Sequence, residues 1–337
     1  MAKDKTKPRA DLAPRREIAA KQEAEQKAKR RRQLTINWTI AIVIVALVAA
    51  GIWGAWSHVK AGEREASIVG PANAAQMTPP NATSDGLAIV VKAADAAAYS
   101  PSLPVPTPTP TDSATDTEPD SSPTTPPVPS TPGAPYIVDF YVDFQSSDSS
   151  TAQTTYGPAL TALSAEGKIT LRYHFLTSGD TTNTNTASSR AAIAAACADT
   201  VGKFLPYTQT ALADTPMSIT SGALVFGDQK LKVDFPAAAG ITGTDLKTFQ
   251  NCYTQRATSA FIATTSAANQ TTAIPGNSTY TSGVSSVPVM VAATPDTPTV
   301  FQSVDISSDM YGSAPSTSED ALLSLIANSA YGTTDNG

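Results

Sequence analysis

The sequence predicts an α/β domain that is preceded by one transmembrane helix and by a disordered spacer rich in proline, threonine and serine. Three observations predict it: an uncharged apolar run near the N-terminus, a run of prolines after it, and a strand-helix-strand pattern beyond the prolines. The 337 residues would suffice for about two domains, but only 7% are aromatic and 15% are charged, whereas 26 are proline. One compact domain of the full length is therefore not expected.

The predicted transmembrane helix, a signal-anchor, covers residues 36–57. Its sequence INWTIAIVIVALVAAGIWGAW carries no charge, and about 20 such residues cross the hydrocarbon core of a bilayer. Trp38 lies near one end and Trp53 and Trp56 near the other, as in the aromatic belts of membrane proteins. Basic residues 29–32 precede the run, so the positive-inside rule places the N-terminus in the cytoplasm and the C-terminal domain outside it.

The charge of the chain is divided in the same way. Residues 1–35 carry a net charge of +7 and the remainder −13, within a total of −6. The basic segment predicts a solvated helix, with a sensor of anionic lipid as the alternative, and the acidic remainder does not suit a nucleic-acid partner. A signal peptide cleaved near residues 59–61 is the alternative to the anchor, but the basic region and the apolar run are both long for one.

The predicted spacer lies within residues 95–133. Residues 101–133 contain eleven prolines, eight threonines and five serines, and this composition cannot bury enough apolar surface to become ordered. Just before it, LAIVVK at 87–92 predicts a strand. We interpret the spacer as a loop between two paired strands, because a lone strand is not stable in water; the alternative is a tether between membrane and domain.

A strand-helix-strand unit follows the spacer. The run YIVDFYVDF at 136–144 is typical of a strand covered on both faces. Tyr156, Leu160 and Leu163 recur at helical spacing, and ITLRYHFL at 169–176 alternates as a half-buried strand.

Helices and a hairpin complete the domain. Residues 188–212 and 244–268 each predict one helix of an insert that covers about residues 180–275. VPVMVAA and TVFQSVDI predict a two-stranded hairpin, and the final helix is expected to begin with a capping box at Ser318 or Thr317. The predicted segments are 1–35 (basic, cytoplasmic), 36–57 (transmembrane), 58–84 (juxtamembrane), 85–94 (first strand), 95–133 (disordered insertion) and 134–332 (remainder of the domain).

Five stretches carry a resemblance to a known family: VDFYVDFQ (138–145), YGPALTAL (156–163), SSRAAIAAACADTVGKF (188–204), FQNCYTQRATSAF (249–261) and GVSSVPV (283–289). In this order they resemble the DsbA-like branch of the thioredoxin fold, in particular its membrane-anchored actinobacterial members. The resemblance implies a thioredoxin-like fold with a helical insert. It also implies that Val287 and Pro288 form the family's cis-proline loop, which lies beside the active site and holds extended peptide.

The chain departs from this family where the family has its Cys-x-x-Cys motif. Ser146, Ser147, Asp148 and Ser149 follow the strand, so Ser146 and Ser149 stand as degenerate active-site positions. Disulfide exchange needs a thiolate and passes through a mixed disulfide, which serine cannot form. We interpret residues 147–150 as a helix N-cap, in which a hydroxyl or the Asp148 carboxylate accepts a backbone N–H.

Other catalytic chemistries find little support. The domain has one histidine within a predicted element, His174, whose phase in its strand points it toward the first helix or toward solvent. A serine, His174 and aspartate triad lacks both a GxSxG elbow and an oxyanion motif. Two cysteines and two histidines in the whole chain are too few for a zinc ribbon, a haem attachment motif or an iron-sulfur cluster, so no metal or other cofactor is expected.

The only two cysteines, Cys197 and Cys252, lie on the two predicted helices of the insert. The family resemblance implies a structural disulfide between these helices. The alternative is a displaced redox pair, although the two cysteines lack the close spacing that lowers a thiol pKa.

Three functions remain open. The first is a redox-degenerate binding module of the cell envelope that holds an extended peptide or protein at Val287 and Pro288 and is attached to the membrane by one helix. The second is a thiol-disulfide oxidoreductase or isomerase that works through Cys197 and Cys252 or through a partner's thiols. The third is a structural protein of the cell envelope in which the spacer sets a distance. We favour the first, for which no catalysis is expected.

Overall fold

The structure is a computed structural model that describes residues 67–99, 133–180, 186–214 and 226–332. The predicted basic segment 1–35, the predicted transmembrane helix 36–57 and residues 100–132 of the predicted spacer lie outside the described residues. Within the described ranges, no helix has both the length and the apolar character needed to span a membrane.

A five-stranded mixed sheet forms the centre of the domain, in the order β1-β3-β2-β4-β5. Strands β2 and β3 are parallel, and the three other pairings are antiparallel. The strands are β1 (Ile89–Val90), β2 (Tyr136–Val142), β3 (Ile169–Phe175), β4 (Val289–Ala293) and β5 (Gln302–Val304). The predicted strand-helix-strand unit and the predicted β4–β5 hairpin are both present.

The first face of the sheet is apolar and is covered by α3 (Ser147–Ala165) and α10 (Glu319–Ala330). Side chains that alternate along β2 and β3 point into this layer, and they pack on buried residues of the two helices. Burial of such side chains is the main stabilising contribution of the layer. The residues are Val138, Phe140, Val142, Leu171, Tyr173, Phe175, Tyr156, Leu160, Leu163, Leu322 and Ile326.

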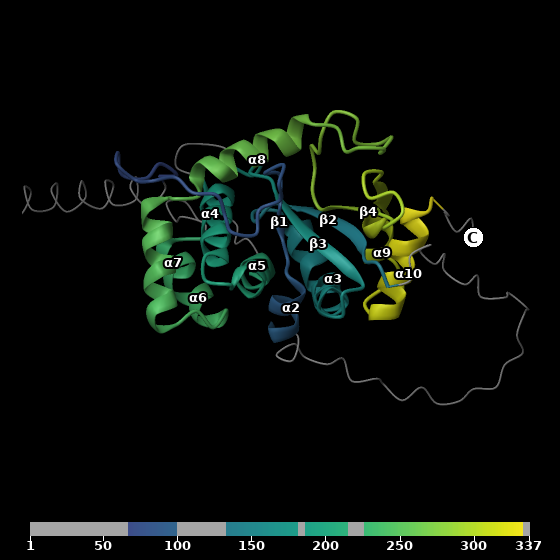
Figure 1. The fold of residues 1–337 in the computed structure, drawn as a ribbon, viewed down its shortest axis with the longest axis horizontal. Helices are drawn as coiled ribbons and strands as arrows, with labels where there is room; N and C mark the ends of the chain where they lie inside the picture. The colour runs from purple at the N-terminus through teal and green to yellow at the C-terminus, as the bar shows by residue number, and fades with distance from the viewer. Residues whose placement is uncertain (1–66, 100–132, 181–185, 215–225, 333–337) are drawn as a thin grey trace, which may run out of the picture. The chain divides into compact units, whose positions relative to one another are not determined.

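The insert between β3 and β4 contains more helices than predicted, and Figure 1 shows α4, α6 and α7 gathered at the β1 side of the sheet. The region predicted as one helix over 188–212 is two helices, because Gly202 adopts φ +65° between them. The region predicted over 244–268 is also two, because Arg256 ends the first with φ +51°. The elements are α4 (Ala187–Asp199), α5 (Phe204–Ala213), η2 (Lys230–Asp234), α6 (Phe235–Ala238), α7 (Gly243–Gln255) and α8 (Ser259–Thr271).

The chain on the N-terminal side of the spacer differs from the prediction. Strand β1 pairs with β3 and not with β2, so the spacer does not join two paired strands. The predicted disordered insertion from 95 begins inside a helix, α2 (Ala93–Tyr99), because its sequence is alanine-rich and Ala96 is buried against the core. A short helix after β5, α9 (Ile306–Met310), was also not predicted; its N-cap is Asp305.

Residues 67–83 run along the insert before they reach β1. The backbone N–H of Met77 donates to the Ala257 carbonyl at 2.7 Å, and the side chain of Gln76 accepts from the Ala260 N–H at 3.0 Å. The backbone and side-chain amides of Asn81 donate to the Asp199 carboxylate at 2.7 and 2.6 Å. This segment is therefore fixed to the loop between α7 and α8 and to the end of α4.

The second face of the sheet is covered by α8 and by the loops on either side of β4, residues 272–288 and 294–301. A smaller apolar cluster lies here, formed by Tyr141, Leu176, Ile274, Val284, Val289, Val291, Ala293 and Phe301. This face also carries charged residues of β2 and β3, which the first face does not.

Candidate functional site

The amino end of α3 is the place where the family resemblance puts an active site. Ser146 is the N-cap, with φ −89° and ψ 119°, and its hydroxyl accepts the backbone N–H of Ser149 at 3.1 Å. The predicted cap at residues 147–150 is therefore wrong by at least one residue. Ser147 and Asp148 are exposed in the first turn, while Ser149 points inward. The Ser149 N–H is therefore accepted neither by a hydroxyl of residues 147–150 nor by the Asp148 carboxylate, the two groups predicted for the cap.

The buried Ser149 contacts the backbone of a buried aspartate, Asp143. Its hydroxyl accepts from the backbone N–H of Asp143 at 3.3 Å. The Asp143 carboxylate accepts from the N–H groups of Gln145 and Gly179, both at 2.8 Å, and from two hydroxyls, those of Ser178 and Ser188. These four hydrogen bonds satisfy the buried carboxylate and join the loop after β2 to the loop after β3 and to the start of α4.

A second acid, Asp180, lies beside Asp143. It accepts from the side-chain amide of Gln145 at 2.9 Å and from the backbone N–H groups of Ser188 and Ser189 at 2.9 and 3.1 Å. Burial raises the pKa of Asp180, its hydrogen bonds oppose this, and the neighbouring Asp143 adds to the rise. Asp180 therefore couples the amino ends of α3 and α4.

Close approach of the two helices at this point depends on Gly179. A Cβ atom at Gly179 would lie 2.8 Å from Cβ of Gln145 and 2.9 Å from the Ser188 hydroxyl. The Asp143 and Asp180 cluster was not predicted from the sequence. The sequence signal for this cluster was Asp143, which lies in the apolar run that ends at Phe144. A carboxylate buried with such a run needs several hydrogen-bond donors around it.

The loop before β4 lies beside the amino end of α3. The hydroxyl of Ser146 is 3.5 Å from the carbonyl oxygen of Val287, at the outer limit of a hydrogen bond, and the Val287–Pro288 peptide bond is cis. Ser285 and Ser286 are exposed. Among the described residues, no group bonds to the backbone N–H of Ser285, Ser286 or Val287. This short stretch thus offers unpaired donors next to Ser146.

The two sulfur atoms lie elsewhere. Cys197 on α4 and Cys252 on α7 form a disulfide with a Cα–Cα distance of 5.7 Å, which confirms the predicted bridge. The cysteines are 0% and 7% exposed, and the Thr258 hydroxyl lies 3.7 Å from the Cys197 sulfur. Exchange requires that a thiolate reach a sulfur atom, and burial opposes this.

His174 occupies neither of the two predicted environments. It is 4% exposed and lies on the second face, toward α8, where its Nδ1 is 3.2 Å from Oδ1 of Asn269. Its ring stacks on Tyr141 with centroids 4.2 Å apart, and its Nε2 lies 3.4 Å from the Asp139 carboxylate. No serine contacts this ring among the described residues, so the structure does not assemble the serine, His174 and aspartate triad.

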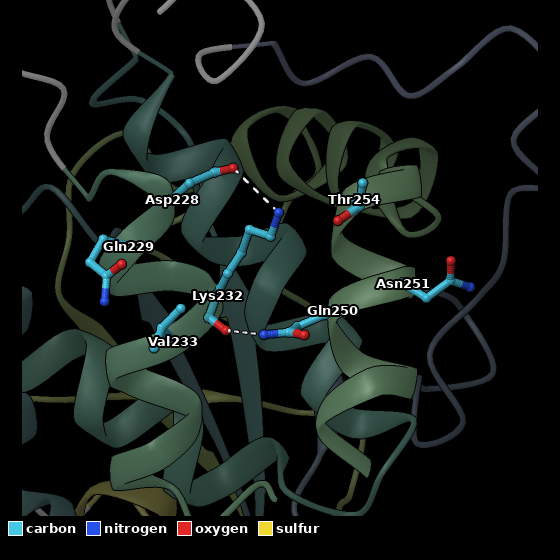
Figure 2. A pocket seen from close by; sticks show the side chains of 7 residues that line it. All are labelled: Asp228, Gln229, Lys232, Val233, Gln250, Asn251 and Thr254. Carbon is cyan, nitrogen blue, oxygen red and sulfur yellow. Dashed lines mark hydrogen bonds and ion pairs between the residues drawn. The ribbon is translucent and has the colours of Figure 1, made fainter. Parts of the chain in front are cut away.

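A surface hollow of about 500 Å³ lies between η2 and α7 (Figure 2). Several of its polar side chains already have partners: Lys232 lies 3.7 Å from the Asp228 carboxylate, and the Gln250 amide donates to the backbone carbonyl of Lys232 at 2.9 Å. It is wide open and holds no buried reactive group. Over the described ranges, no group of histidine, cysteine, aspartate or glutamate side chains could hold a metal ion.

Comparisons with solved structures return disulfide oxidoreductases as similar structures. A DsbG from Mycobacterium tuberculosis matches at 18% identity over 63% of this chain and 90% of its own, with a TM-score of 0.38. DsbA from the same organism matches at 17% over 64% and 94%, with 0.35. The thiol-disulfide oxidoreductase MdbA from Actinomyces oris matches at 13% over 59% and 82%, with 0.44.

No protein-family model and no curated protein matches the sequence. The solved structures that match are of the kind that the sequence resembles, DsbA-like thioredoxin-fold proteins. The structure agrees with that resemblance in its strand order, in the parallel β2–β3 pair joined by α3, and in the helical insert between β3 and β4.

Proposed function

We propose that this chain, which has a DsbA-like thioredoxin fold, binds extended peptide segments at the cell envelope and does not exchange disulfides. The observation that carries the proposal is the pairing of two features at one place. A capping hydroxyl, that of Ser146, stands where exchange would need a thiol, and the unpaired backbone N–H groups of residues 285–287 lie beside it.

The unpaired backbone supports peptide binding for a physical reason. An extended peptide that lies alongside exposed backbone donors can add hydrogen bonds like those of a sheet edge, and affinity then depends on the peptide backbone more than on its sequence. Val287 is half-buried and its carbonyl is close to Ser146, so the peptide would cross the amino end of α3.

Burial of the sulfur atoms argues against the alternative, in which Cys197 and Cys252 act as a redox pair. Neither sulfur lies at a helix N-terminus, and α4 and α7 enclose both. The anchor and the extracytoplasmic position belong to the proposal and rest on the apolar run 36–57 and the charges before it. Protease added to intact cells should therefore cleave the domain without prior lysis.

Peptide binding can be tested with the 337-residue chain and a library of labelled extended peptides. We expect some to bind. Their N-methylated versions keep the carbonyl acceptors but carry methyl groups that block close approach along the paired edge, so they should bind at least about tenfold more weakly. Val287→Asp should weaken binding similarly, because it places a carboxylate next to the incoming peptide. The double variant Ser146→Ala, Ser149→Ala should still bind.

Two results would contradict the proposal. Equal binding of N-methylated and unmodified peptides would exclude backbone pairing. Reduction of a disulfide substrate that disappears in Cys197→Ser, while the variant remains folded, would favour the oxidoreductase instead.

A further inference from the structure

A cavity of about 240 Å³ lies on the second face of the sheet, away from the amino end of α3. Its walls come from separate parts of the chain: residues 83–87 before β1, strands β2 and β3, the end of α8, and the β4–β5 turn. The apolar lining includes Leu87, Ile274, Pro275 and Phe301. A dry cavity of about 150 Å³ already accepts a benzene molecule, so this one has room for a substituted ring.

The charges at the base of the cavity compensate one another. Arg172 forms a bidentate ion pair with Asp139 through Nε and Nη2, with Nη2 2.7 Å from Oδ2, and its guanidinium lies 5.3 Å above the ring of Phe301. Burial opposes the charge of the Asp139 carboxylate, but His174 and Arg172 together outweigh this effect, so the pKa of Asp139 is lowered. Asp85 at the rim accepts from Thr83 and from the Leu87 N–H.

Two donors at this base are unused. Nη1 of Arg172 bonds to none of the described residues, and neither does the hydroxyl of Tyr141, although Tyr141 is only 5% exposed. The Tyr141 hydroxyl oxygen is not fully enclosed by protein, and because Tyr141 lines the cavity, the hydroxyl reaches the cavity. Burial raises the pKa of Tyr141 well above its ordinary value, which keeps the hydroxyl protonated and able to donate.

From these groups we propose that the cavity is a binding site for a small, uncharged, amide-bearing molecule with an apolar ring-sized body. A carbonyl oxygen can accept from both the Tyr141 hydroxyl and Nη1 of Arg172. The apolar walls take the body of the ligand, as in most small-molecule sites.

Charge selects against ionic ligands. The Arg172 charge is already matched by Asp139, so a carboxylate ligand would add an uncompensated negative charge near Asp85. A cationic group at the base would lie against the like charge of the Arg172 guanidinium and would leave Nη1 of Arg172 without an acceptor, while Asp85 at the rim already accepts from Thr83 and the Leu87 N–H. This site is separate from the proposed peptide site, so either can fail without the other.

Three isosteric probes test the proposal: benzamide, benzoate and benzamidine, which are neutral, anionic and cationic. Binding to the 337-residue chain would be followed by titration calorimetry and by NMR shifts. Benzamide should bind with a dissociation constant of about 1 mM or lower and at least about fivefold more tightly than either ion.

Tyr141→Phe tests the hydroxyl without disturbing the fold, because this hydroxyl bonds to none of the described residues. It should weaken benzamide binding by about fivefold to tenfold, the usual value of one hydrogen bond. Thr272→Trp fills the mouth of the cavity and should abolish binding, whereas Thr271→Trp, an exposed neighbour outside the lining, should not change it.

The site is excluded if benzamide does not bind at about 10 mM, or if Thr272→Trp leaves binding unchanged. The proposed preference for uncharged ligands is excluded if benzoate or benzamidine binds more tightly than benzamide. Equal binding by Tyr141→Phe and the unaltered chain would exclude the hydroxyl as the recognising group.

Discussion

The amino end of α3 and the contact between α4 and α7 use oxygen and sulfur in opposite ways. At α3, the hydroxyl of Ser146 caps a helix at a half-exposed position. At the contact between α4 and α7, two sulfur atoms form a covalent bond that solvent barely reaches. In this chain the two sulfur atoms are bonded to each other and buried, whereas the group at the amino end of α3 is a half-exposed hydroxyl that caps the helix.

Removal of the disulfide should have the largest effect. The double variant Cys197→Ala, Cys252→Ala frees a loop with a sequence separation of 55. In the chain-entropy model, this lowers the free energy of unfolding by about 4 kcal/mol, which urea denaturation would measure. The unaltered chain with its disulfide chemically reduced serves as the control, because it keeps both sulfur atoms in place. A loss below about 1 kcal/mol in both would remove the scaffold role.

Removal of the cap should have a smaller effect. Ser146→Ala leaves the Ser149 N–H without its acceptor, and we expect the free energy of unfolding to fall by about 1 kcal/mol. Ser147→Ala is the matched control, because the Ser147 side chain is exposed and bonds to none of the described residues. If Ser147→Ala costs as much as Ser146→Ala, the assignment of the cap is wrong. Chemical denaturation of both variants decides this.

The smallest effect concerns Asp180, which links the two regions through the amino end of α4. Because its pKa is raised in the fold, its contribution is greatest below the unfolded pKa of about 3.8 and is lost as pH rises through the folded value. Relative to Asp180→Asn, which keeps an acceptor oxygen but cannot ionise, the unaltered chain should lose stability between about pH 3 and pH 7. Urea midpoints for both proteins across this range would show it. A difference in urea midpoint between the two proteins that stays constant with pH would contradict the raised pKa of Asp180.

Elements with a strong local pattern could be predicted from the sequence. The alternation in β3 and the apolar run of β2 identify both strands, and Ser318 is the N-cap of α10, one of the two residues expected. The breaks at Gly202 and Arg256 were missed, because a left-handed residue inside an alanine-rich or polar helix gives only a weak local signal. Helix α2 was missed since its burial depends on partners distant in the chain.

The candidate sites depended still more on tertiary contacts. The position of the serines relative to the strand predicted the amino end of α3, but the phase of a single strand could not decide which layer covers His174. Tyr141 was read as part of an apolar run. The environment of its hydroxyl, which bonds to none of the described residues, depends on α8, the β4–β5 turn and residues 83–87, which the fold brings together around it.

The attachment of residues 67–83 to the insert has a mechanical consequence. The side chain of Arg256 donates to the Ser67 carbonyl at 2.9 Å, and the hydrogen bonds of Met77 and Asn81 continue the contact toward α4. A tensile load applied at Ser67 would therefore pass first into the α7–α8 junction, and the covalent link from Cys252 to Cys197 would carry it into α4. The sheet and the amino end of α3 would be shielded from that load until these contacts broke.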